Sequence, residues 1–377
     1  MRYFIKTFGC QMNASDSERV ASLLEEIGYK KASSLKEADL VIFNLCSVRQ
    51  TAVDRIYGQF NPKSQLKNSK NKRQKIFITG CILDKDKKKL QSKTQGIFNI
   101  RELDKGFKKV AQDFFKKNNL TKKEKKLLGN SRDLEASYLK IRPKYKYSDQ
   151  AFVPIMTGCD NFCSYCVVPY TRGREWSRPV EDIVKEVEEL VKNKYQEIVL
   201  LGQNVNSYRS WLEDNKNKMV DFADLLKILN ALPGDFQISF LTNHPKDMSS
   251  KLIKIIASLS KVKKHIHLPL QSGADEILKK MNRKYTQKDY LSLIKKIKKE
   301  IPEVILSTDV IVGFPGETEE QFQQTVKVIQ EVGFSEVFIN KYSPRHGTLA
   351  YRKYKDDISW KEKKRRWEEI AKLLKDR

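Results

Sequence analysis

Residues 152–166, FVPIMTGCDNFCSYC, decide the fold of this chain, because they join a strand to three closely spaced cysteines. Residues 152–156 predict a buried strand, and the loop after it carries Cys159, Cys163 and Cys166 in a C-x3-C-x2-C spacing. A structural zinc site needs four ligands, and no fourth cysteine or histidine lies nearby in the sequence. Three thiolates in one loop instead suit a [4Fe–4S] cluster that keeps one iron open for a small molecule.

Strand-like and helix-like runs alternate after this loop. The predicted strands are residues 197–201, 236–241, 265–268, 305–310 and 336–340, and the predicted helices are residues 180–192, 222–232, 251–259, 290–299 and 319–332. With the strand before the cysteines they make six βα units, which predict a partial TIM-like (βα)6 barrel over residues 148–357. In such barrels the chemistry lies at the carboxyl ends of the strands, where the cysteine loop also lies.

Three further motif-like stretches fall at the ends of predicted strands: LLGQNVNSY (200–208), HLPLQSG (267–273) and TDVIVGFPGET (308–318). In the last of these, Gly313 and Gly316 allow the backbone to approach a ligand closely. The alternative is ordinary loop chemistry, since Gly, Pro and Asn favour turns in any case. None of the four histidines has a partner at ligand spacing, so we assign none to a metal.

The N-terminal part contains three more strand-like runs, residues 2–8, 39–45 and 75–79, each followed by a cysteine. Alternating strands and helices predict a doubly wound parallel sheet, in which ligands bind beyond the carboxyl ends of the strands. We therefore expect the three cysteines to converge and to suit an open [4Fe–4S] cluster or an open zinc site. The alternative is three small hydrophobic residues at strand ends. The cysteines are Cys10, Cys46 and Cys81.

The first helix of this part is expected to be capped by Ser15 and Ser17 and to end at Ile27. The whole N-terminal domain is predicted over residues 1–118. Residues 119–147 are rich in Lys and Asn and predict a linker, with some helix before it at residues 107–115. After the barrel, residues 358–377 predict a basic C-terminal helix.

Composition limits the classes of protein that remain. At 377 residues the chain is too long for one ordinary domain, and 40% hydrophobic residues exclude a wholly disordered chain. No apolar run approaches the roughly 20 residues that span a bilayer, and MRYFIKTFGC does not resemble a signal peptide, so we expect a soluble cytoplasmic protein. The 73 Lys and Arg exceed the 47 Asp and Glu by 26, which favours a nucleic-acid partner, although Lys-rich coding could produce the same excess.

The sequence resembles the methylthiotransferase family of radical S-adenosylmethionine (SAM) enzymes, and within it the tRNA-modifying MiaB type. The cysteine spacing is the hallmark of radical SAM enzymes, and Tyr165 matches the aromatic residue before the last cysteine. The resemblance covers nearly the whole chain. The motifs that carry it are KTFGCQMNASDSERV, ADLVIFNLCSVRQTA, ITGC, GCDNFCSYCVVPYTRGREWSRP, LLGQNVNSY, HLPLQSG, MNRKYT, TDVIVGFPGETEEQF and YSPRHGT.

This resemblance implies that a methylthio group is installed at C2 of N6-isopentenyladenosine at tRNA position 37, beside the anticodon. One cluster would bind SAM through its open iron, and one-electron reduction would yield a 5′-deoxyadenosyl radical that abstracts hydrogen. A second [4Fe–4S] cluster would supply the sulfur, and a second SAM would donate the methyl group. By this resemblance Cys159, Cys163 and Cys166 hold the first cluster, and Cys10, Cys46 and Cys81 hold the second.

The resemblance also suggests residues around the cofactor, with no catalytic residue beyond the cluster ligands. Tyr165 would contact the SAM adenine, and the expected neighbours of SAM or substrate are Gln203, Asn204, Gly313 and Gly316. Arg172 and Arg174 would meet tRNA phosphate or the SAM carboxylate, the alternative being a surface ion pair.

Two departures from the family pattern stand out. Family members usually carry a small TRAM β-barrel that grips tRNA, and we expect none here because the chain ends at Arg377. The high positive charge is expected to substitute in part for that domain. The second departure is His346, where the family usually has proline.

The expected partners are the tRNA anticodon stem-loop and an electron donor such as flavodoxin or ferredoxin, with no membrane and a monomeric chain. Two alternatives stay open. The first is a methylthiotransferase that acts on threonylcarbamoyl-adenosine in tRNA or on a ribosomal protein. The second is a non-catalytic Fe–S or zinc protein that binds RNA.

Overall fold

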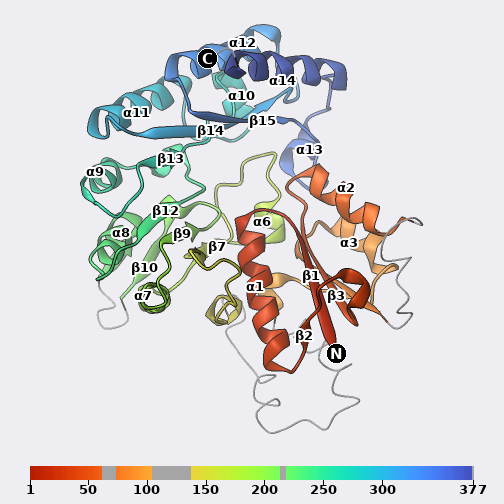
Figure 1. Cartoon of the computed structure of the whole chain (residues 1–377). Helices are drawn as coiled ribbons and strands as arrows, with labels where there is room; N and C mark the ends of the chain where they lie inside the picture. The colour runs from red at the N-terminus through yellow and green to blue at the C-terminus, as the bar shows by residue number, and fades with distance from the viewer. Residues whose placement is uncertain (62–73, 104–136, 213–217, 376–377) are drawn as a thin grey trace. The chain divides into compact units, whose positions relative to one another are not determined.

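A computed structural model describes residues 1–61, 74–103, 137–212 and 218–375 of the chain (Figure 1). These residues form two compact units. The first comprises Met1–Ser148 with Tyr170–Arg178, and the second comprises Asp149–Pro169 with Pro179–Arg377. The short segment that follows the C-x3-C-x2-C loop therefore belongs to the first unit.

The first unit is built on a parallel sheet in the order β2-β1-β3-β4-β5. Its strands are β1 (Arg2–Phe8), β2 (Lys30–Lys31), β3 (Leu40–Cys46), β4 (Lys75–Cys81) and β5 (Gly96–Ile97). Every residue of the central strand β3 is buried, because a parallel sheet is covered on both faces. Helix α1 (Gln11–Glu26) lies on one face, whereas α2 (Gln50–Gln59) and α3 (Asp84–Gln91) supply core residues to the other (Figure 1). The predicted doubly wound sheet is confirmed.

The start of α1 was predicted wrongly. The helix begins at Gln11, so Ser15 and Ser17 lie inside it rather than before it, and it ends at Glu26. Its N-cap is Cys10, whose backbone N–H donates to the Asn13 side chain at 3.3 Å. The Asn13 side chain, three residues after the N-cap, thus satisfies one of the free backbone N–H groups at the start of the helix.

The described part of the predicted linker 119–147 packs into the first unit. It begins with the short helix η3 (Ser137–Lys140), where Tyr138 and Leu139 are buried. Farther on, the backbone N–H of Lys144 donates to the carbonyl of Glu18 at 3.2 Å. The helix predicted at residues 107–115 lies outside the described residues. Two more short helices complete the unit, η1 (Leu35–Glu37) and η2 (Ile100–Glu102).

The second unit holds six parallel strands in two groups, ordered β12-β9-β6 and β13-β14-β15. They are β6 (Gln150–Pro154), β9 (Glu197–Leu201), β12 (Gln237–Phe240), β13 (His265–His267), β14 (Ile305–Val312) and β15 (Glu336–Lys341). The main helices between them are α7 (Val180–Lys192), α8 (Phe222–Asn230), α9 (Ser250–Ser258), α10 (Asp275–Lys280), α11 (Gln287–Glu300) and α12 (Glu319–Val332). The predicted partial (βα)6 barrel is confirmed, and α10 is the one of these helices that the sequence pattern did not predict.

Short elements complete the chain, including an antiparallel hairpin of β10 with β11. They are β7 (Met156–Thr157), α6 (Val168–Thr171), β8 (Trp176–Ser177), η4 (Val205–Ser207), β10 (Arg209–Trp211), β11 (Met219–Asp221), η5 (Pro245–Asp247) and α13 (Leu349–Lys353). The predicted C-terminal helix is α14 (Trp360–Lys375), which packs against β15. Within the described ranges, no helix is long and apolar enough to cross a membrane.

Candidate functional site

The three cysteines of the first unit lie at one edge of its parallel sheet. Cys46 and Cys81 end β3 and β4 as register partners, and their thiols hydrogen-bond to each other. Cys10 follows the end of β1 by two residues, and it is close enough to raise the pKa of Cys46 electrostatically. Cys46 and Cys81 are buried and Cys10 is exposed. The sheet topology thus brings together three thiols that are far apart in the sequence.

A buried arginine faces this thiol cluster from the segment that follows the second unit's cysteine loop. Nε of Arg172 donates to Sγ of Cys81 at 2.9 Å, and Nη2 pairs with Oδ2 of Asp16 at 2.5 Å. The side chains of Arg172 and Asp16 are only 2% and 1% exposed. The expected contacts of Arg172 with tRNA phosphate, with SAM or with a surface partner are therefore wrong, because its guanidinium is buried inside the first unit. Arg174 is exposed.

These contacts set the charge of the two buried thiols in opposite directions. The hydrogen bond from Cys46 and the positive charge of Arg172 lower the pKa of Cys81 to about 6, although burial opposes this. The same hydrogen bond, together with burial, raises the pKa of Cys46. Cys81 is therefore the thiol of this pair that is held as a thiolate near neutral pH, the form that binds metals.

In the second unit, each cysteine of the loop after β6 accepts a hydrogen bond at sulfur. The Asn161 side chain donates to Cys159 at 3.5 Å, and the backbone N–H of Val168 donates to Cys166 at 3.5 Å. Nη1 of the buried Arg283 side chain donates to Sγ of Cys163 at 3.4 Å. Burial, then the neighbouring Cys163, raises the pKa of Cys166. N–H donors directed at sulfur are the surroundings that Fe–S clusters use to tune their potentials.

Arg283 belongs to the MNRKYT motif, to which the sequence assigned no function. Besides Cys163 its guanidinium contacts the carbonyl of Pro269 at 3.1 Å and the hydroxyl of Tyr285 at 2.8 Å. Burial, and then the Arg283 charge, lower the pKa of the nearby His244 to about 2, so this histidine stays neutral. Only the motif itself could have indicated Arg283, since its contact with Cys163 spans 120 residues.

The same motif holds the backbone of the cysteine loop. The Asn282 side chain donates to the carbonyl of Phe162 at 2.9 Å, where the chain adopts a positive φ of 48°. The backbone N–H of Ser164 donates to the carbonyl of Met281 at 2.9 Å, and its hydroxyl donates to the carbonyl of Lys280 at 2.8 Å. A loop fixed at three points keeps its thiols in place before a cluster is bound.

The structure places the polar residues predicted as SAM neighbours beside the same loop and β9. Oε1 of Gln203 accepts from the backbone N–H of Gly158 at 2.6 Å, immediately before Cys159. Asn204 is buried and donates to Asp247 at 2.8 Å, while its Oδ1 has no hydrogen-bond partner among the described residues. Gln203 therefore supports the loop. An unpaired buried oxygen on Asn204 fits a residue that completes its hydrogen bonds with a ligand.

Tyr165 packs against a buried cluster that includes Met281, Phe314 and Tyr342. Burial, then the Cys163 charge, raise its pKa well above the usual value. The ring is thus a neutral, partly buried aromatic surface between two of the cysteines. Its contact with the SAM adenine stays a prediction.

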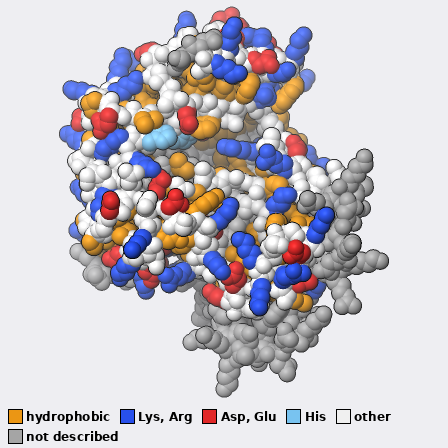
Figure 2. All heavy atoms as spheres, viewed as in Figure 1, with side chains coloured by type: hydrophobic (Ala, Val, Ile, Leu, Met, Phe, Trp, Pro, Cys, Tyr) orange, Lys and Arg blue, Asp and Glu red, His pale blue; other side chains and the backbone are white. Residues whose placement is uncertain are grey.

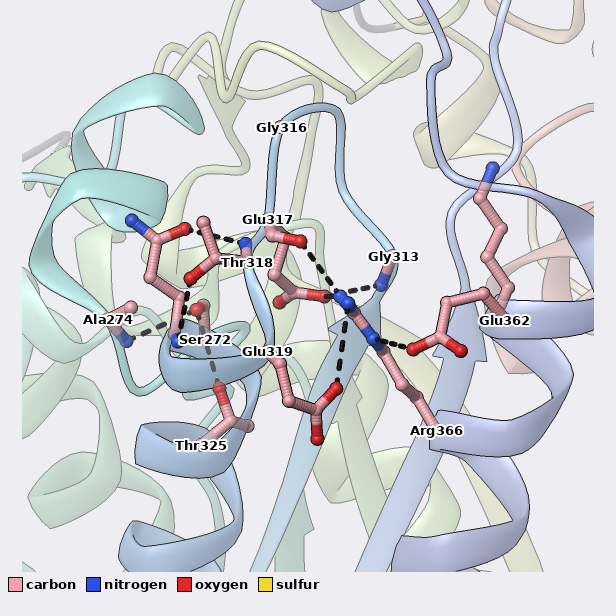
Figure 3. A network of polar contacts seen from close by, with 12 residues as sticks. Ser272, Ala274, Gly313, Gly316, Glu317, Thr318, Glu319, Thr325, Glu362 and Arg366 are labelled. Carbon is pink, nitrogen blue, oxygen red and sulfur yellow. Dashed lines mark hydrogen bonds and ion pairs between the residues drawn. The ribbon is translucent and has the colours of Figure 1, made fainter.

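Gly313 and Gly316 do approach other groups closely, but those groups belong to the chain itself (Figure 3). The N–H of Gly313 donates to Oε2 of Glu317 at 2.6 Å, and a Cβ at Gly313 would lie 2.4 Å from Cγ of Lys363. The N–H of Gly316 donates to Asp357 at 2.8 Å. Gly313 therefore makes room for the C-terminal helix, whereas a Cβ at Gly316 would lie 2.9 Å from Nζ of Lys280. The proximity of both glycines to SAM or substrate stays a prediction.

Figure 3 shows how α14 is fixed to this turn. Nη1 of Arg366 pairs with Oε2 of Glu317 at 2.8 Å, and both side chains are nearly fully buried. Nε of Arg366 contacts Glu362 of the same helix at 2.7 Å. Burial raises the pKa of Glu317, and the hydrogen bonds from Gly313 and Arg366 and the charge of Arg366 oppose this shift.

The two cysteine triads fit iron–sulfur clusters by donor type and surroundings. Among the described residues, no three Cys, His, Asp or Glu side chains are arranged around one metal-ion position. A cubane cluster binds each cysteine through a different iron, so its thiols need not converge on one point. The assignment therefore rests on the loops that carry the six cysteines and on the N–H donors directed at four of their sulfurs.

Two family models match this chain. The Radical SAM superfamily matches residues 153–329, which run from the end of β6 through β14 into α12 and do not include β15. The Uncharacterized protein family UPF0004 matches residues 2–99, which contain the sheet of the first unit.

Curated proteins named tRNA-2-methylthio-N(6)-dimethylallyladenosine synthase are similar to nearly the whole chain. The protein of Clostridium tetani (strain Massachusetts / E88) is 46% identical over 93% of this chain and 76% of its own length. That of Alkaliphilus oremlandii (strain OhILAs) is 42% identical over 98% and 77%. That of Thermotoga petrophila is 41% identical over 100% and 82%.

Solved structures share the fold at low sequence identity. The radical SAM methyltransferase TsrM from Kitasatospora setae, solved with cobalamin and a [4Fe–4S] cluster, superposes with a TM-score of 0.59 and 12% identity. The match covers 93% of this chain and 77% of that one. The cobalamin-dependent radical enzyme OxsB has a TM-score of 0.56 and 10% identity over 93% of this chain and 54% of its own.

Proposed function

The chain belongs to the tRNA-2-methylthio-N(6)-dimethylallyladenosine synthase family of radical SAM enzymes, and we propose that it methylthiolates C2 of N6-isopentenyladenosine at tRNA position 37. The observation that carries this proposal is the presence of two cysteine triads, one in each unit, on a chain at least 41% identical to relatives of that name. A methylthiolation by radical chemistry needs both a site that activates the C–H bond and a source of sulfur. The two triads supply two sites.

The residues of each triad have distinct functions in this proposal. Cys159, Cys163 and Cys166 hold the [4Fe–4S] cluster that binds SAM. The other triad, at Cys10, Cys46 and Cys81, holds the second cluster. When bound, the first cluster and SAM would supply the radical chemistry that activates the C2–H bond, and the second cluster would supply the sulfur.

The protein's own groups orient and tune these sites. Arg283 and Asn161 donate hydrogen bonds to the sulfurs of the SAM-binding triad, and Asn282 holds the loop that carries them. The positively charged Arg172 side chain donates a hydrogen bond to Sγ of Cys81 in the other triad. Second-sphere donors of this kind orient the ligands and set the potential of a metal site.

We also propose the partners of the reaction. The tRNA anticodon stem-loop is the substrate, and the excess of 26 positive charges favours its binding. A small redox protein such as flavodoxin or ferredoxin supplies the electron, and the chain acts as a monomer in the cytoplasm.

The test separates the two sites by their products. Cys163→Ala is expected to abolish the formation of deoxyadenosine, whereas Cys46→Ala keeps part of SAM cleavage and loses sulfur insertion. Iron and sulfide are measured after anaerobic reconstitution, where two cubanes predict about eight irons per chain and about four in either variant. The product is identified by mass spectrometry of nucleosides from isopentenylated tRNA.

Three outcomes would overturn the proposal. Thiomethylation by Cys46→Ala would remove the division of labour between the triads. A modified threonylcarbamoyl-adenosine or ribosomal protein in place of the expected nucleoside would change the substrate. Bound zinc alone, with no iron, would indicate a non-catalytic RNA-binding protein.

A further inference from the structure

One face of β13, β14 and β15 in the second unit, which we call the open face, carries the partly exposed side chains of Asp309 and Phe338. Side chains alternate across a strand, and on β14 Val310 and Val312 are buried on the helix side. Lys341, the register partner of Val312, lies over the ring of Trp367 of α14 and marks the same side. Asp309 directly precedes Val310 on the strand and therefore points to the opposite, open face.

A polar network occupies the open face. Nε2 of His267 lies 2.9 Å from Oδ2 of Asp309, and its Nδ1 lies 3.1 Å from the hydroxyl of Ser307. Nε2 of His265 contacts the same hydroxyl at 3.0 Å, and the side chain of Asn340 donates to Oδ1 of Asp309 at 3.3 Å. Each carboxylate oxygen of Asp309 thus has a polar contact among the described residues, and a carboxylate oxygen can accept more than one hydrogen bond. The carboxylate is held in one orientation while 28% of the side chain stays exposed.

An exposed aromatic ring lies beside this network. Phe338 is the register partner of Asp309 and is 47% exposed. Its ring meets that of His267 at 5.8 Å and 63°, an edge-to-face contact that fixes its position. Histidine side chains are visible next to hydrophobic ones on the face that Figure 2 presents. Asp309 on β14 and Phe338 on β15 therefore form a surface that is polar at the carboxylate and apolar at the ring.

This surface is close to the SAM-binding loop within the same unit. Ile311, which points to the open face like Asp309, packs against the same hydrophobic cluster as Tyr165 of the cysteine loop. Asp309 precedes Ile311 by two residues, which is about 7 Å along a strand. A substrate atom held at Asp309 would thus lie one side-chain layer from the loop that binds the cofactor.

The substrate of the proposed reaction has the matching chemistry. N6-isopentenyladenine carries one N6–H donor and a five-carbon hydrocarbon chain on the same nitrogen. A carboxylate accepts the N–H, and an aromatic ring offers apolar surface to the chain. We propose that the open face of β13, β14 and β15 binds the isopentenylated adenine, with Asp309 accepting from N6–H and Phe338 packing on the isopentenyl group.

This inference rests on the proposed function and names the residues that select its substrate. His267 acts as a positioning residue, since it holds Asp309 and Phe338 rather than the adenine. The two contacts make different predictions, because an unmodified adenine also has an N6–H but has no hydrocarbon chain. Asp309 therefore contributes to the binding of both RNAs, and Phe338 contributes only to the binding of the modified one.

The experiment measures binding and needs no turnover. A synthetic anticodon stem-loop RNA, with or without isopentenyl on adenosine 37, is titrated with the anaerobically reconstituted full chain, and fluorescence anisotropy gives both Kd values. The wild type is expected to prefer the modified RNA by about tenfold or more, from burial of the hydrocarbon chain. Phe338→Ala removes this preference, while Phe338→Leu keeps most of it because it retains an apolar side chain. Asp309→Asn is expected to weaken the binding of both RNAs, raising the two Kd values by a similar factor.

Trp211→Ala is the matched control, since Trp211 is a 56% exposed aromatic residue on another strand, β10. It is expected to leave the ratio of the two Kd values unchanged. If the wild type prefers the modified RNA and Phe338→Ala keeps that preference, the inference is wrong and the proposed function stands. If the wild type shows no preference, the isopentenylated substrate itself is wrong, and the inference is overturned with it.

Discussion

Replacing Arg172 by Met is predicted to destabilise the first unit strongly, because it breaks a buried ion pair from one side. Nη2 of Arg172 lies 2.5 Å from Oδ2 of Asp16, with the two side chains 2% and 1% exposed. Oδ1 of Asp16 has no hydrogen-bond partner among the described residues. Without Arg172, the carboxylate would stay buried with no cation, and Cys81 would lose an N–H donor.

The expected cost follows from the burial of the pair. Removing one partner of a buried ion pair costs about 3–5 kcal/mol, a large share of the roughly 5–15 kcal/mol that stabilises a domain. Replacing both partners with apolar residues of similar volume is often neutral, because no charge is left uncompensated. The double variant Asp16→Leu with Arg172→Met is therefore expected to be more stable than Arg172→Met alone.

Native-state hydrogen exchange read by mass spectrometry provides the assay, since it reports the opening free energy of each unit separately. The amides of the central strand β3 report the first unit. Arg2→Met is the matched control in the same unit, because Arg2 pairs with Glu37 at 3.1 Å while their side chains are 51% and 46% exposed. An exposed pair contributes at most about 1 kcal/mol.

The reasoning would be refuted by either of two results. One is an Arg172→Met variant within about 1 kcal/mol of Arg2→Met, which would mean that the buried pair contributes no more than an exposed one. The other is a double variant no more stable than the single one, which would attribute the cost to packing rather than to an unpaired charge.

Three further predictions concern the second unit. His244→Gln should reduce the loss of stability that the second unit suffers as the pH falls. Burial, and then the Arg283 charge, lower the pKa of His244 in the folded chain to about 2. Below the ordinary histidine pKa of about 6.5, only the unfolded chain therefore binds a proton at this residue. The wild type should then lose about 1.4 kcal/mol between pH 7.5 and 5.5 in urea unfolding, and equal pH slopes would contradict this. Gly313→Ala should lower the free energy of unfolding by about 1–3 kcal/mol, because φ is +70° and the new Cβ would lie 2.4 Å from Cγ of Lys363. The amides of α14 should then be less protected from hydrogen exchange, and unchanged protection would refute the prediction. Asn282→Gly should speed the release of iron to a chelator with little change in the unfolding temperature, since it frees the cysteine loop and glycine readily adopts the φ of +58° at this position; an unchanged release rate would count against it.

The sequence predicted the elements whose evidence is local. The strand runs at residues 2–8 and 197–201 coincide with β1 and β9, since short apolar runs between turn signals specify buried strands directly. The sequence also predicted that Cys46 and Cys81 meet at one edge of the sheet, because parallel strands carry their carboxyl ends on the same side.

What the sequence could not predict depends on contacts between distant residues. Arg172 looks like any surface arginine until Asp16, 156 positions away, is seen beside it. The link between Asn282 and the cysteine loop spans 120 positions in the same way. Gly313 was expected to let the backbone approach a ligand, and the sequence did not indicate that Lys363 of the chain itself lies beside it. Local patterns specify backbone conformation, and tertiary packing decides which side chain uses it.

The inclusion of residues 170–178 in the first unit affects the order in which the chain can fold during synthesis. When residue 148 has left the ribosome, the nascent N-terminal unit has its sheet but still lacks the cation that neutralises Asp16. That cation arrives only after another 24 residues, once β6 and the whole cysteine loop have been translated. Because domains otherwise fold in turn from the N-terminus, this unit stays incomplete until translation of its neighbour is under way.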